Sequence, residues 1–450
     1  MKKNIATIRK LAKDSAKTGK KSLSEGVSQV KNLKGKLQKT EEVEDKYVVA
    51  LDIGTEFVKA LTAQYSEDNL EIIGVGMARQ DPTAMSAGAV TDIGKVIEVC
   101  DKALLQAEKS AKVAARSAII GVAGELVKGM SNTITYKREN PQAEITVTEL
   151  EDIISKIQDK AYDIAKNELS WETGSDELEI KIVNSAIISM NIDGYKVTNP
   201  IGFQGRDFKL QVYNAFAPLV HVGALQKIAS ELDLDLLTIA AEPFAVARSV
   251  LGQGNDEFSA ILVDIGGGTT DIALVNEGGV DGTKMYGIGG RSFSRSIANS
   301  LNIDLSEAEE LKLKHSKFPD TVPTKYQEDL FASIKSTVEL WQHGLQISLE
   351  ELTGNDQLPN QLLFCGGGSG LKSILTSTKQ GGWTEDLQIS DKLKVRQISS
   401  DDVKNITNST SVNLGHTFIT SMGLLRVGRD TMSVDTATRI QSKVNQLLKL

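Results

Sequence analysis

Residues 258–280 read FSAILVDIGGGTTDIALVNEGGV, which is an apolar run, a glycine-rich turn and a second apolar run. Apolar runs of this length between turn residues predict two buried β-strands joined as a hairpin. Glycine lets the backbone of such a turn approach a ligand closely, so that its amide groups can point at phosphate oxygens. One glycine turn alone is weak evidence for a phosphate site, because most such turns are simple connections.

Related patterns appear twice more in the chain. Residues 47–61 read YVVALDIGTEFVKAL, and residues 361–371 read QLLFCGGGSGL. Two matching hairpins and a third glycine turn after a buried strand rarely occur together by chance. We therefore expect one polyphosphate site, built from three turns that lie far apart in the chain.

Polar side chains of the two hairpins fit this interpretation. Asp52 and Asp264 end the first strand of each hairpin and would repel a bare phosphate, so we expect them to hold Mg²⁺ through its water shell. Lys59 lies four residues after Thr55 and is expected to reach back to a β- or γ-phosphate as a point charge. The expected hydroxyl donors are Thr55, Thr269 and Thr270.

The three segments resemble the phosphate 1, phosphate 2 and adenosine motifs of the actin-like ATPase superfamily, and they come in the same order. Within this superfamily the chain is similar to the FtsA family of bacterial cell-division proteins, from Tyr47 to Gly428. Strings such as AEPFAVA, IGGRSFSRSIA and SEAEELKLKH carry this likeness. The resemblance implies an α/β, actin-like (ribonuclease H-like) fold with two lobes, with ATP and Mg²⁺ in the cleft between them, and an inserted α+β subdomain of FtsA type.

The resemblance also implies which residues act at this site. It makes Glu242 the residue that orients an attacking water in what is at most a weak ATPase. A helix-capping or interdomain carboxylate without a catalytic duty is the alternative. Glu309 and Lys312 match an A-E-x-x-K pattern that contacts ribose and adenine, and an incidental match on a solvated helix face is the alternative. The expected nucleotide contacts are Gly54, Thr55, Lys59, Gly266, Gly267, Gly268, Thr269, Thr270, Gly289, Gly290, Glu309, Lys312, Gly366, Gly367, Gly368 and Ser369.

Three features depart from the family pattern. Arg291 follows IGG where the family more often has Asp, Glu56 and Phe57 are bulky residues in the first turn, and the adenosine motif starts from Cys365. These departures bear on nucleotide specificity and turnover more than on the fold.

The composition limits the possible classes of protein. A chain of 450 residues with 40% hydrophobic and 24% charged residues is globular and too long for one compact core. Its apolar runs are shorter than a membrane-spanning helix requires, and its N-terminus lacks the apolar core of a secretory signal, so we expect a cytoplasmic location. Two cysteines are too few for a disulfide framework or a zinc site.

The charge is unevenly distributed along the chain. The net charge is -8, yet residues 1–40 hold twelve Lys or Arg against Asp14 and Glu25. The acidic remainder makes nucleic acid an unexpected partner, whereas the basic tail suits an anionic membrane surface.

The last residues of the chain have the pattern of an amphipathic helix. Four apolar residues share one helical face, with basic residues around it: Ile440, Val444, Leu447 and Leu448, then Arg439, Lys443 and Lys449. Such a helix can lie in the headgroup region of a membrane, and docking onto the body of the protein or onto a partner is the alternative.

The predicted domains follow from these patterns. They are a basic tail at 1–46, a first lobe at 47–126 and 219–255, an inserted subdomain at 127–218, a second lobe at 256–292 and 363–430 with a helical subdomain at 293–362, and a linker with the C-terminal helix at 431–450.

The resemblance implies an ATP-binding adaptor that self-associates into filaments and connects an FtsZ-like tubulin polymer, with other division proteins, to the cytoplasmic membrane at the division site. A PilM-like platform for type IV pilus assembly is one alternative. A sugar kinase or phosphatase of the same superfamily is another, although an aromatic content of 5% offers no sugar-binding cluster.

Overall fold

A computed structural model describes residues 46–66, 69–124, 126–175, 177–251, 257–353, 357–380 and 382–432. The chain divides into two units, residues 1–45 and residues 46–450, and the described residues all belong to the second unit. The predicted basic tail and C-terminal amphipathic helix therefore lie outside the described residues. Within the described part, no helix combines the length and apolar character needed to cross a membrane.

The first sheet has six strands in the order β11-β6-β1-β2-β3-β17. The first three strands of the chain form an antiparallel meander, whereas β6 and β11 run parallel to β1 on its other side. The strands are β1 (Tyr47–Ile53), β2 (Phe57–Tyr65), β3 (Leu70–Arg79), β6 (Ser117–Val122), β11 (Asp235–Ala241) and β17 (Ile406–Asn408). A short separate hairpin is formed by β4 (Met85–Ser86) and β5 (Ala89–Val90).

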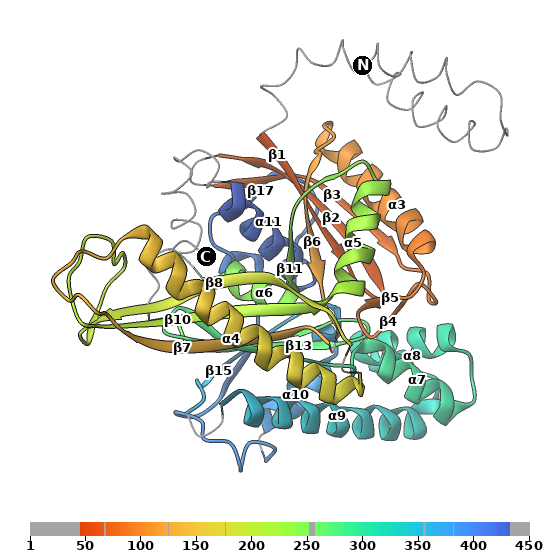
Figure 1. Cartoon of the computed structure of the whole chain (residues 1–450). Coiled ribbons are helices and arrows are strands. Elements are labelled where there is room, and N and C mark those ends of the chain that lie inside the picture. Colours follow the sequence, from red (N-terminus) through yellow and green to blue (C-terminus); the bar gives the residue numbers. More distant parts are fainter. Residues whose placement is uncertain are drawn as a thin grey trace, which may run out of the picture. The chain divides into compact units, whose positions relative to one another are not determined.

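Helices cover both faces of this sheet, which explains why β1 is apolar almost throughout. On one face α3 (Ile93–Ala111) packs against β2 and β3, beside α5 (Leu219–Glu231); α6 (Glu242–Val250) and α11 (Ile419–Met432) lie on the other (Figure 1). The side chain of Asp92 caps α3 by accepting a hydrogen bond from the Lys95 amide. We call this sheet and its helices the first lobe.

The second sheet has nine strands in the order β16-β15-β12-β13-β14-β7-β10-β8-β9. Its first part consists of β12 (Ala260–Ile265), β13 (Thr270–Asn276) and β14 (Gly279–Tyr286) as an antiparallel meander, with β15 (Gln361–Cys365) and β16 (Lys394–Gln397) added in parallel. Its remaining strands are β7 (Lys128–Lys137), β10 (Asp207–Pro218), β8 (Ile180–Ile192) and β9 (Tyr195–Lys196). The strands of the inserted segment thus continue the second sheet.

The junction between these two parts of the sheet depends on a close approach at Gly129. Gly129 pairs with Thr283 of β14, and a Cβ at Gly129 would overlap the hydroxyls of Thr283 and Tyr213. Glycine is therefore required for the insert to join the sheet at this register. Because residues 127–218 and 256–292 share one sheet, the boundary between insert and second lobe remains a prediction.

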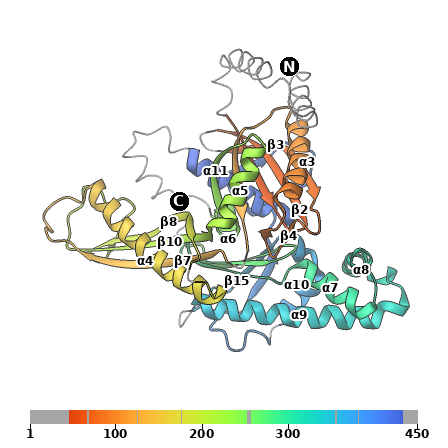
Figure 2. The same cartoon turned by 45° about the vertical axis from the view of Figure 1, so that its right-hand side comes forward.

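Helices also pack on the second sheet. The long helix α4 (Val147–Thr173) lies along β7 and β10, and α9 (Thr324–Thr353) lies near α7 (Gly290–Leu301) and α8 (Leu305–Lys317) (Figure 2). The core around α9 contains the fully buried Trp341. We call β12 to β16, α7 to α9 and α10 (Lys372–Gln380) the second lobe. Short 3-10 helices occur at Pro319–Thr321, Gly367–Gly370, Ser400–Asp402 and His416–Phe418.

The local predictions are largely confirmed. The two predicted hairpins, at 47–65 and 260–276, are present. The side chain of Thr146 caps α4 by accepting a hydrogen bond from the Glu149 amide. The strand β7 was not predicted. Its sequence, KGMSNTITYK, is rich in polar residues, because most of its positions beyond Gly129 are partly or fully exposed.

Candidate functional site

The two predicted phosphate turns lie against each other. A Cβ built on Gly268 would lie 2.7 Å from the Thr55 hydroxyl, and one on Gly267 would lie 2.8 Å from the Glu56 Cβ. These distances leave no room for a side chain, so the turn at Gly54 and the turn at Gly266 to Gly268 are in direct contact. The structure therefore brings together two segments that are separated by more than two hundred residues in the sequence.

The third glycine turn reaches the same place. Gly366 has φ +81°, and a Cβ there would overlap Oδ1 of Asp264. This position therefore needs glycine both for its backbone conformation and for space. Ser369 is buried and its hydroxyl donates to the Gly366 carbonyl at 2.8 Å. Gly367 is open, with no atom within 4 Å of a Cβ built on it.

The predicted metal-site aspartates are buried at the inner ends of the two hairpins. Oδ2 of Asp52 accepts from Lys59 Nζ at 3.0 Å and from the Ser421 hydroxyl at 2.9 Å. Asp264 accepts a hydrogen bond from the hydroxyl of Thr420. Because Thr420 and Ser421 are neighbours at the start of α11, one helix end contacts carboxylates from both sheets.

Two further carboxylates surround this pair. Asp271 lies directly opposite Asp264 in the β12–β13 ladder, and Glu242 begins α6. Both are buried, and Oδ1 of Asp271 has no hydrogen-bond partner among the described residues. With Asp52 and Asp264 they form a cluster of four buried carboxylates, and the charges of Asp52, Asp264 and Glu242 act on the ammonium group of Lys59.

Burial and mutual repulsion shift the protonation of this cluster. Burial, with the charges of Asp52, Asp271 and Asp264, raises the pKa of Glu242 well above its ordinary value, although Lys59 opposes the shift. Burial raises the pKa of Asp264, and burial with the charge of Asp264 raises that of Asp271. Burial alone would lower the pKa of Lys59, but the surrounding carboxylates raise it. Glu242, Asp264 and Asp271 therefore bind protons more tightly than isolated carboxyl groups do.

The carboxylates do not form a closed metal cage. Within the described ranges, no three His, Cys, Asp or Glu side chains stand close enough together to hold a metal ion directly. Such an arrangement suits a cation that keeps most of its water shell, as Mg²⁺ usually does. The carboxylates of this cluster offer oxygen atoms as ligands, which also fits a hard cation.

The residues expected near the sugar and base pack beside the second turn. The amide of Gly290 donates to the Gly266 carbonyl at 2.9 Å, and a Cβ on Gly289 would come within 2.8 Å of that carbonyl oxygen. Lys312 Nζ donates to the Gly290 carbonyl at 2.9 Å and to Glu309 Oε2 at 2.7 Å.

The third hydrogen bond of the Lys312 ammonium goes to the Ser294 hydroxyl at 2.9 Å. All three donors of this group are therefore used within α7 and α8. A ligand would have to replace one of these contacts to bind Lys312. In the structure Glu309 and Lys312 connect α8 to α7, and their contact with a nucleotide stays a prediction.

Glu242 is also connected to the inserted segment. Oδ1 of Asn184, on β8, accepts from the Ala241 amide at 2.7 Å, one residue before Glu242. Two residues after Glu242, the ring of Phe244 stacks on Tyr213 of β10 with centroids 5.4 Å apart. Two strands of the insert thus fix the start of α6.

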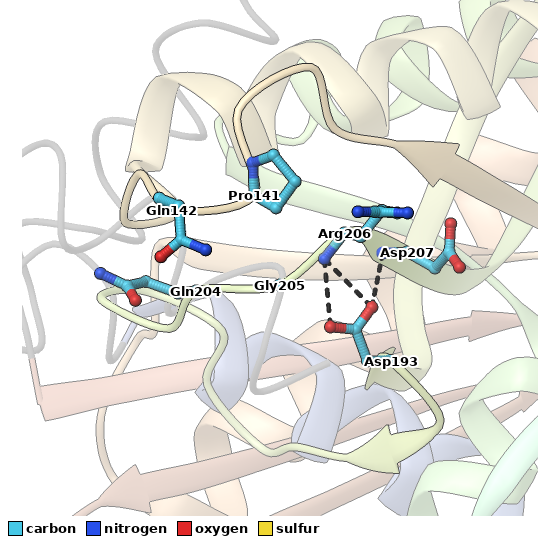
Figure 3. Close-up of a pocket in the computed structure, with 7 residues that line it drawn as sticks. All are labelled: Pro141, Gln142, Asp193, Gln204, Gly205, Arg206 and Asp207. Carbon is cyan, nitrogen blue, oxygen red and sulfur yellow. Dashed lines mark hydrogen bonds between the residues drawn. The ribbon is translucent and has the colours of Figure 1, made fainter.

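A separate hollow of about 470 Å³ lies at the far end of the insert (Figure 3). It is lined by residues of three loops, including Pro141, Gln204 and Arg206. The Asp193 carboxylate at its edge accepts hydrogen bonds from the amides of Arg206 and Asp207 at 2.7 to 3.1 Å. This carboxylate therefore stabilises its own loop, and the hollow lacks the glycine turns of a phosphate site.

Comparison with known proteins agrees with these features. The sequence model of a family described as Cell division protein FtsA matches residues 261–412, which include the second and third glycine turns. The cell division protein FtsA of Pseudomonas aeruginosa is 28% identical over 273 residues, and the match covers 60% of this chain and 61% of that protein. The predicted resemblance to FtsA is confirmed. The FtsA of Enterococcus faecalis is 24% identical over 347 residues, covering 73% of this chain and 74% of that protein. The match thus spans less than two thirds of the Pseudomonas FtsA.

A solved structure supports the fold. One chain of the PilM-PilN type IV pilus biogenesis complex superposes with a TM-score of 0.60 at 16% identity, covering 85% of this chain and 98% of that chain. The predicted actin-like fold with two lobes and an added α+β segment is confirmed.

Three residues of the cluster were not predicted from the sequence. Asp271 follows Asp264 by the same seven positions by which Lys59 follows Asp52, so the repeat itself contained the signal. Thr420 and Ser421 gave no comparable signal, because hydroxyl residues in an otherwise apolar helix are common.

Proposed function

We propose that the chain binds ATP with Mg²⁺ at its three glycine turns and uses the bound nucleotide to set the separation of its two lobes. The observation that carries this proposal is the position of Asp52 and Asp264, which come from different sheets and meet at one helix end. A hydrated cation between them is contacted by both lobes at once. The amides of the turns and the Thr55 hydroxyl then face the phosphates.

Mg²⁺ fits the charge of the site. Three of the four buried carboxylates act on the Lys59 ammonium, and one oxygen of Asp271 is left without a hydrogen-bond partner among the described residues. When bound, Mg²⁺ neutralises negative charge on the phosphates and on these carboxylates. Lys59 supplies a further positive charge within reach of the first turn.

We propose Glu242 as the residue that orients water in a slow hydrolysis. A carboxylate is a useful general base when its pKa lies nearer the working pH, and burial moves Glu242 in that direction. Asn184 and Tyr213 of the insert contact Ala241 and Phe244, which lie before and after Glu242, so the position of Glu242 depends on the insert.

Nucleotide binding has a direct conformational consequence at this site. Thr55 and Gly268 touch, so phosphates can occupy the space between the turns only after the hairpins separate. A ligand that binds only the separated arrangement shifts the lobes towards it. The same shift can control a surface elsewhere on the lobes, including one used for self-association.

We propose that this nucleotide-dependent change serves cell division. The relatives from Pseudomonas aeruginosa and Enterococcus faecalis are both cell division proteins by name. The proposed role is an adaptor that self-associates into filaments and connects an FtsZ-like tubulin polymer to the anionic inner membrane surface, with other division proteins. The basic segment at 1–40 and the amphipathic segment at 437–450 are the proposed membrane contacts.

Vesicle flotation tests this role. The full chain is mixed with an FtsZ-type tubulin homologue and with vesicles containing phosphatidylglycerol, with Mg²⁺ and ATP. We expect the tubulin homologue to float with the vesicles only when the chain is present, and to stay at the bottom when residues 437–450 are deleted. Failure of the full chain to float the tubulin homologue would refute the adaptor role.

A PilM-like platform is the second candidate, because the PilM chain superposes over nearly its whole length. Such a platform would bind a short peptide from a membrane protein. In the same flotation assay, a PilN-type cytoplasmic peptide in place of the tubulin homologue distinguishes the two candidates.

A further inference from the structure

Glu56 in the first phosphate turn is contacted by an arginine from each lobe. Arg79 of β3 places Nε 3.0 Å from Glu56 Oε1, and Arg291 at the start of α7 places Nε 2.8 Å from Oε2. The two contacts differ in exposure, since 60% of the Arg79 side chain is exposed but only 10% of the Arg291 side chain. The Arg291 contact is therefore the less screened of the two.

The Glu56–Arg291 ion pair joins the two turns on which the nucleotide proposal rests. Glu56 follows Thr55, and its Cβ lies against Gly267 of the second turn. The amide of Arg291 donates to the Gly267 carbonyl at 2.8 Å. Glu56 is thus part of the first turn, and Arg291 is anchored to the second turn through its backbone amide.

Separation of the hairpins would affect the two arginines differently. Arg79 pairs with Phe57 in the β2–β3 ladder, and the Gln80 amide donates to the Glu56 carbonyl at 2.9 Å, so Arg79 moves with Glu56. Arg291 moves with the second turn. Opening the site thus breaks the Arg291 contact and leaves the Arg79 contact in place.

We propose that Arg291 determines specificity for a nucleoside triphosphate by exchanging Glu56 for the terminal phosphate. This inference rests on the proposed nucleotide binding. The released guanidinium would lie at the turns with no carboxylate partner, and its planar fork binds phosphate oxygens well. Arg79 stays beside Glu56, and because its side chain is 60% exposed this contact has little energetic weight. A nucleoside diphosphate has no γ-phosphate for Arg291 to bind, so the loss of the Glu56 contact is not compensated when the site opens.

Binding of ATP and of ADP to the full chain, measured by calorimetry with Mg²⁺, tests the exchange. Arg291→Gln is expected to reduce the preference for ATP over ADP about tenfold, the usual effect of losing one charged hydrogen bond. Arg79→Gln is the matched control, because it removes an arginine from the same carboxylate without an interlobe contact, and its preference should change less than about twofold. Arg291→Lys, which keeps the charge but not the fork, should fall between wild type and Arg291→Gln.

A double variant distinguishes contact between Arg291 and the phosphate from simple loss of the Glu56–Arg291 ion pair. Glu56→Gln frees Arg291 and should tighten ATP binding, and adding Arg291→Gln to it should weaken ATP binding about tenfold again. Equal ATP affinity in Glu56→Gln and in the double variant would overturn the exchange, as would an unchanged preference in Arg291→Gln. If the wild-type chain binds neither nucleotide, the proposed function fails as well; if its binding depends on Asp264 but not on Arg291, only this inference fails.

Discussion

The two glycine hairpins share a backbone plan but differ in charge at the residue opposite the first aspartate. In both, the last cross-strand pair encloses four residues, and the first glycine amide donates across the turn, from Gly54 to Phe57 at 3.1 Å and from Gly266 to Thr269 at 2.9 Å. The residue opposite the first aspartate is Lys59 in one hairpin and Asp271 in the other.

We infer from this difference that the two hairpins have different roles at the site. In the first lobe Asp52 is neutralised by its own cross-strand neighbour, so that hairpin is stable without a ligand. In the second lobe two carboxylates face each other in a ladder. Burial raises the pKa of both, and the charge of Asp264 adds to the rise at Asp271. The first hairpin is thus suited to place the positive charge of Lys59 near a phosphate, and the second is suited to attract a metal ion.

Removal of the Lys59 ammonium group should have the largest effect on stability. Lys59→Met leaves Asp52 buried without its ion-pair partner, and we expect the free energy of unfolding to fall by about 3 to 5 kcal/mol at neutral pH. Chemical denaturation without Mg²⁺ measures this loss. The control is Lys95→Met, which removes an exposed pair with Asp81 and should cost less than about 1 kcal/mol. Similar losses in the two variants would contradict the assigned role of Lys59.

Removal of the Asp271 carboxylate should instead raise the free energy of unfolding. Asp271→Asn relieves repulsion with Asp264, so we expect the free energy of unfolding without Mg²⁺ to rise by about 1 to 2 kcal/mol at neutral pH. Chemical denaturation gives this value, and a lower stability than wild type would contradict it.

The pH dependence of the same variant provides a second check. Because their pKa values are raised, Asp264 and Asp271 bind protons more tightly in the folded state than in the unfolded chain. The stability they contribute is complete below about pH 4 and is lost as the pH rises through the folded values. The wild-type chain should therefore lose stability between about pH 4 and neutrality more steeply than Asp271→Asn. Parallel pH profiles would contradict this reasoning.

Alanine at the first glycine of each turn should produce the smallest effects. A Cβ on Gly54 would lie 2.7 Å from the Phe57 carbonyl oxygen, whereas one on Gly266 would lie 3.4 Å from that of Thr269. Gly54→Ala is therefore expected to destabilise the chain by about 1 to 2 kcal/mol, and Gly266→Ala by less than about 1 kcal/mol. Thermal unfolding of the two variants compares them directly, and the reverse order would show that the turns differ in another way.

The sequence predicts the local elements well because apolar runs and glycine turns are local signals. The hairpins and their buried aspartates could be read from neighbouring residues. The polar strand β7 could not, since its register depends on the approach of Gly129 to Thr283. Its pairing with β14, which merges the insert with the second sheet, is a tertiary property.

The candidate site, too, could be predicted only in part from the sequence. The sequence indicated the three turns and Lys59, because the repeat of the hairpins is visible in one dimension. The contact between Glu56 and Arg291 joins residues 235 positions apart, and nothing in either local pattern indicates the other. Arg291 was noted only as a departure from the family pattern, and its partner became evident from the structure.

Magnesium-dependent nucleotide binding by Asp264→Ala tests the central claim most directly. We expect the wild-type chain to bind ATP at least about tenfold more tightly with Mg²⁺ than with a chelator, and Asp264→Ala to bind with the same weak affinity in both conditions. Thermal unfolding of the variant verifies that it is folded. Wild-type, magnesium-dependent affinity in folded Asp264→Ala would contradict the assignment of the metal and nucleotide to the junction of the three turns.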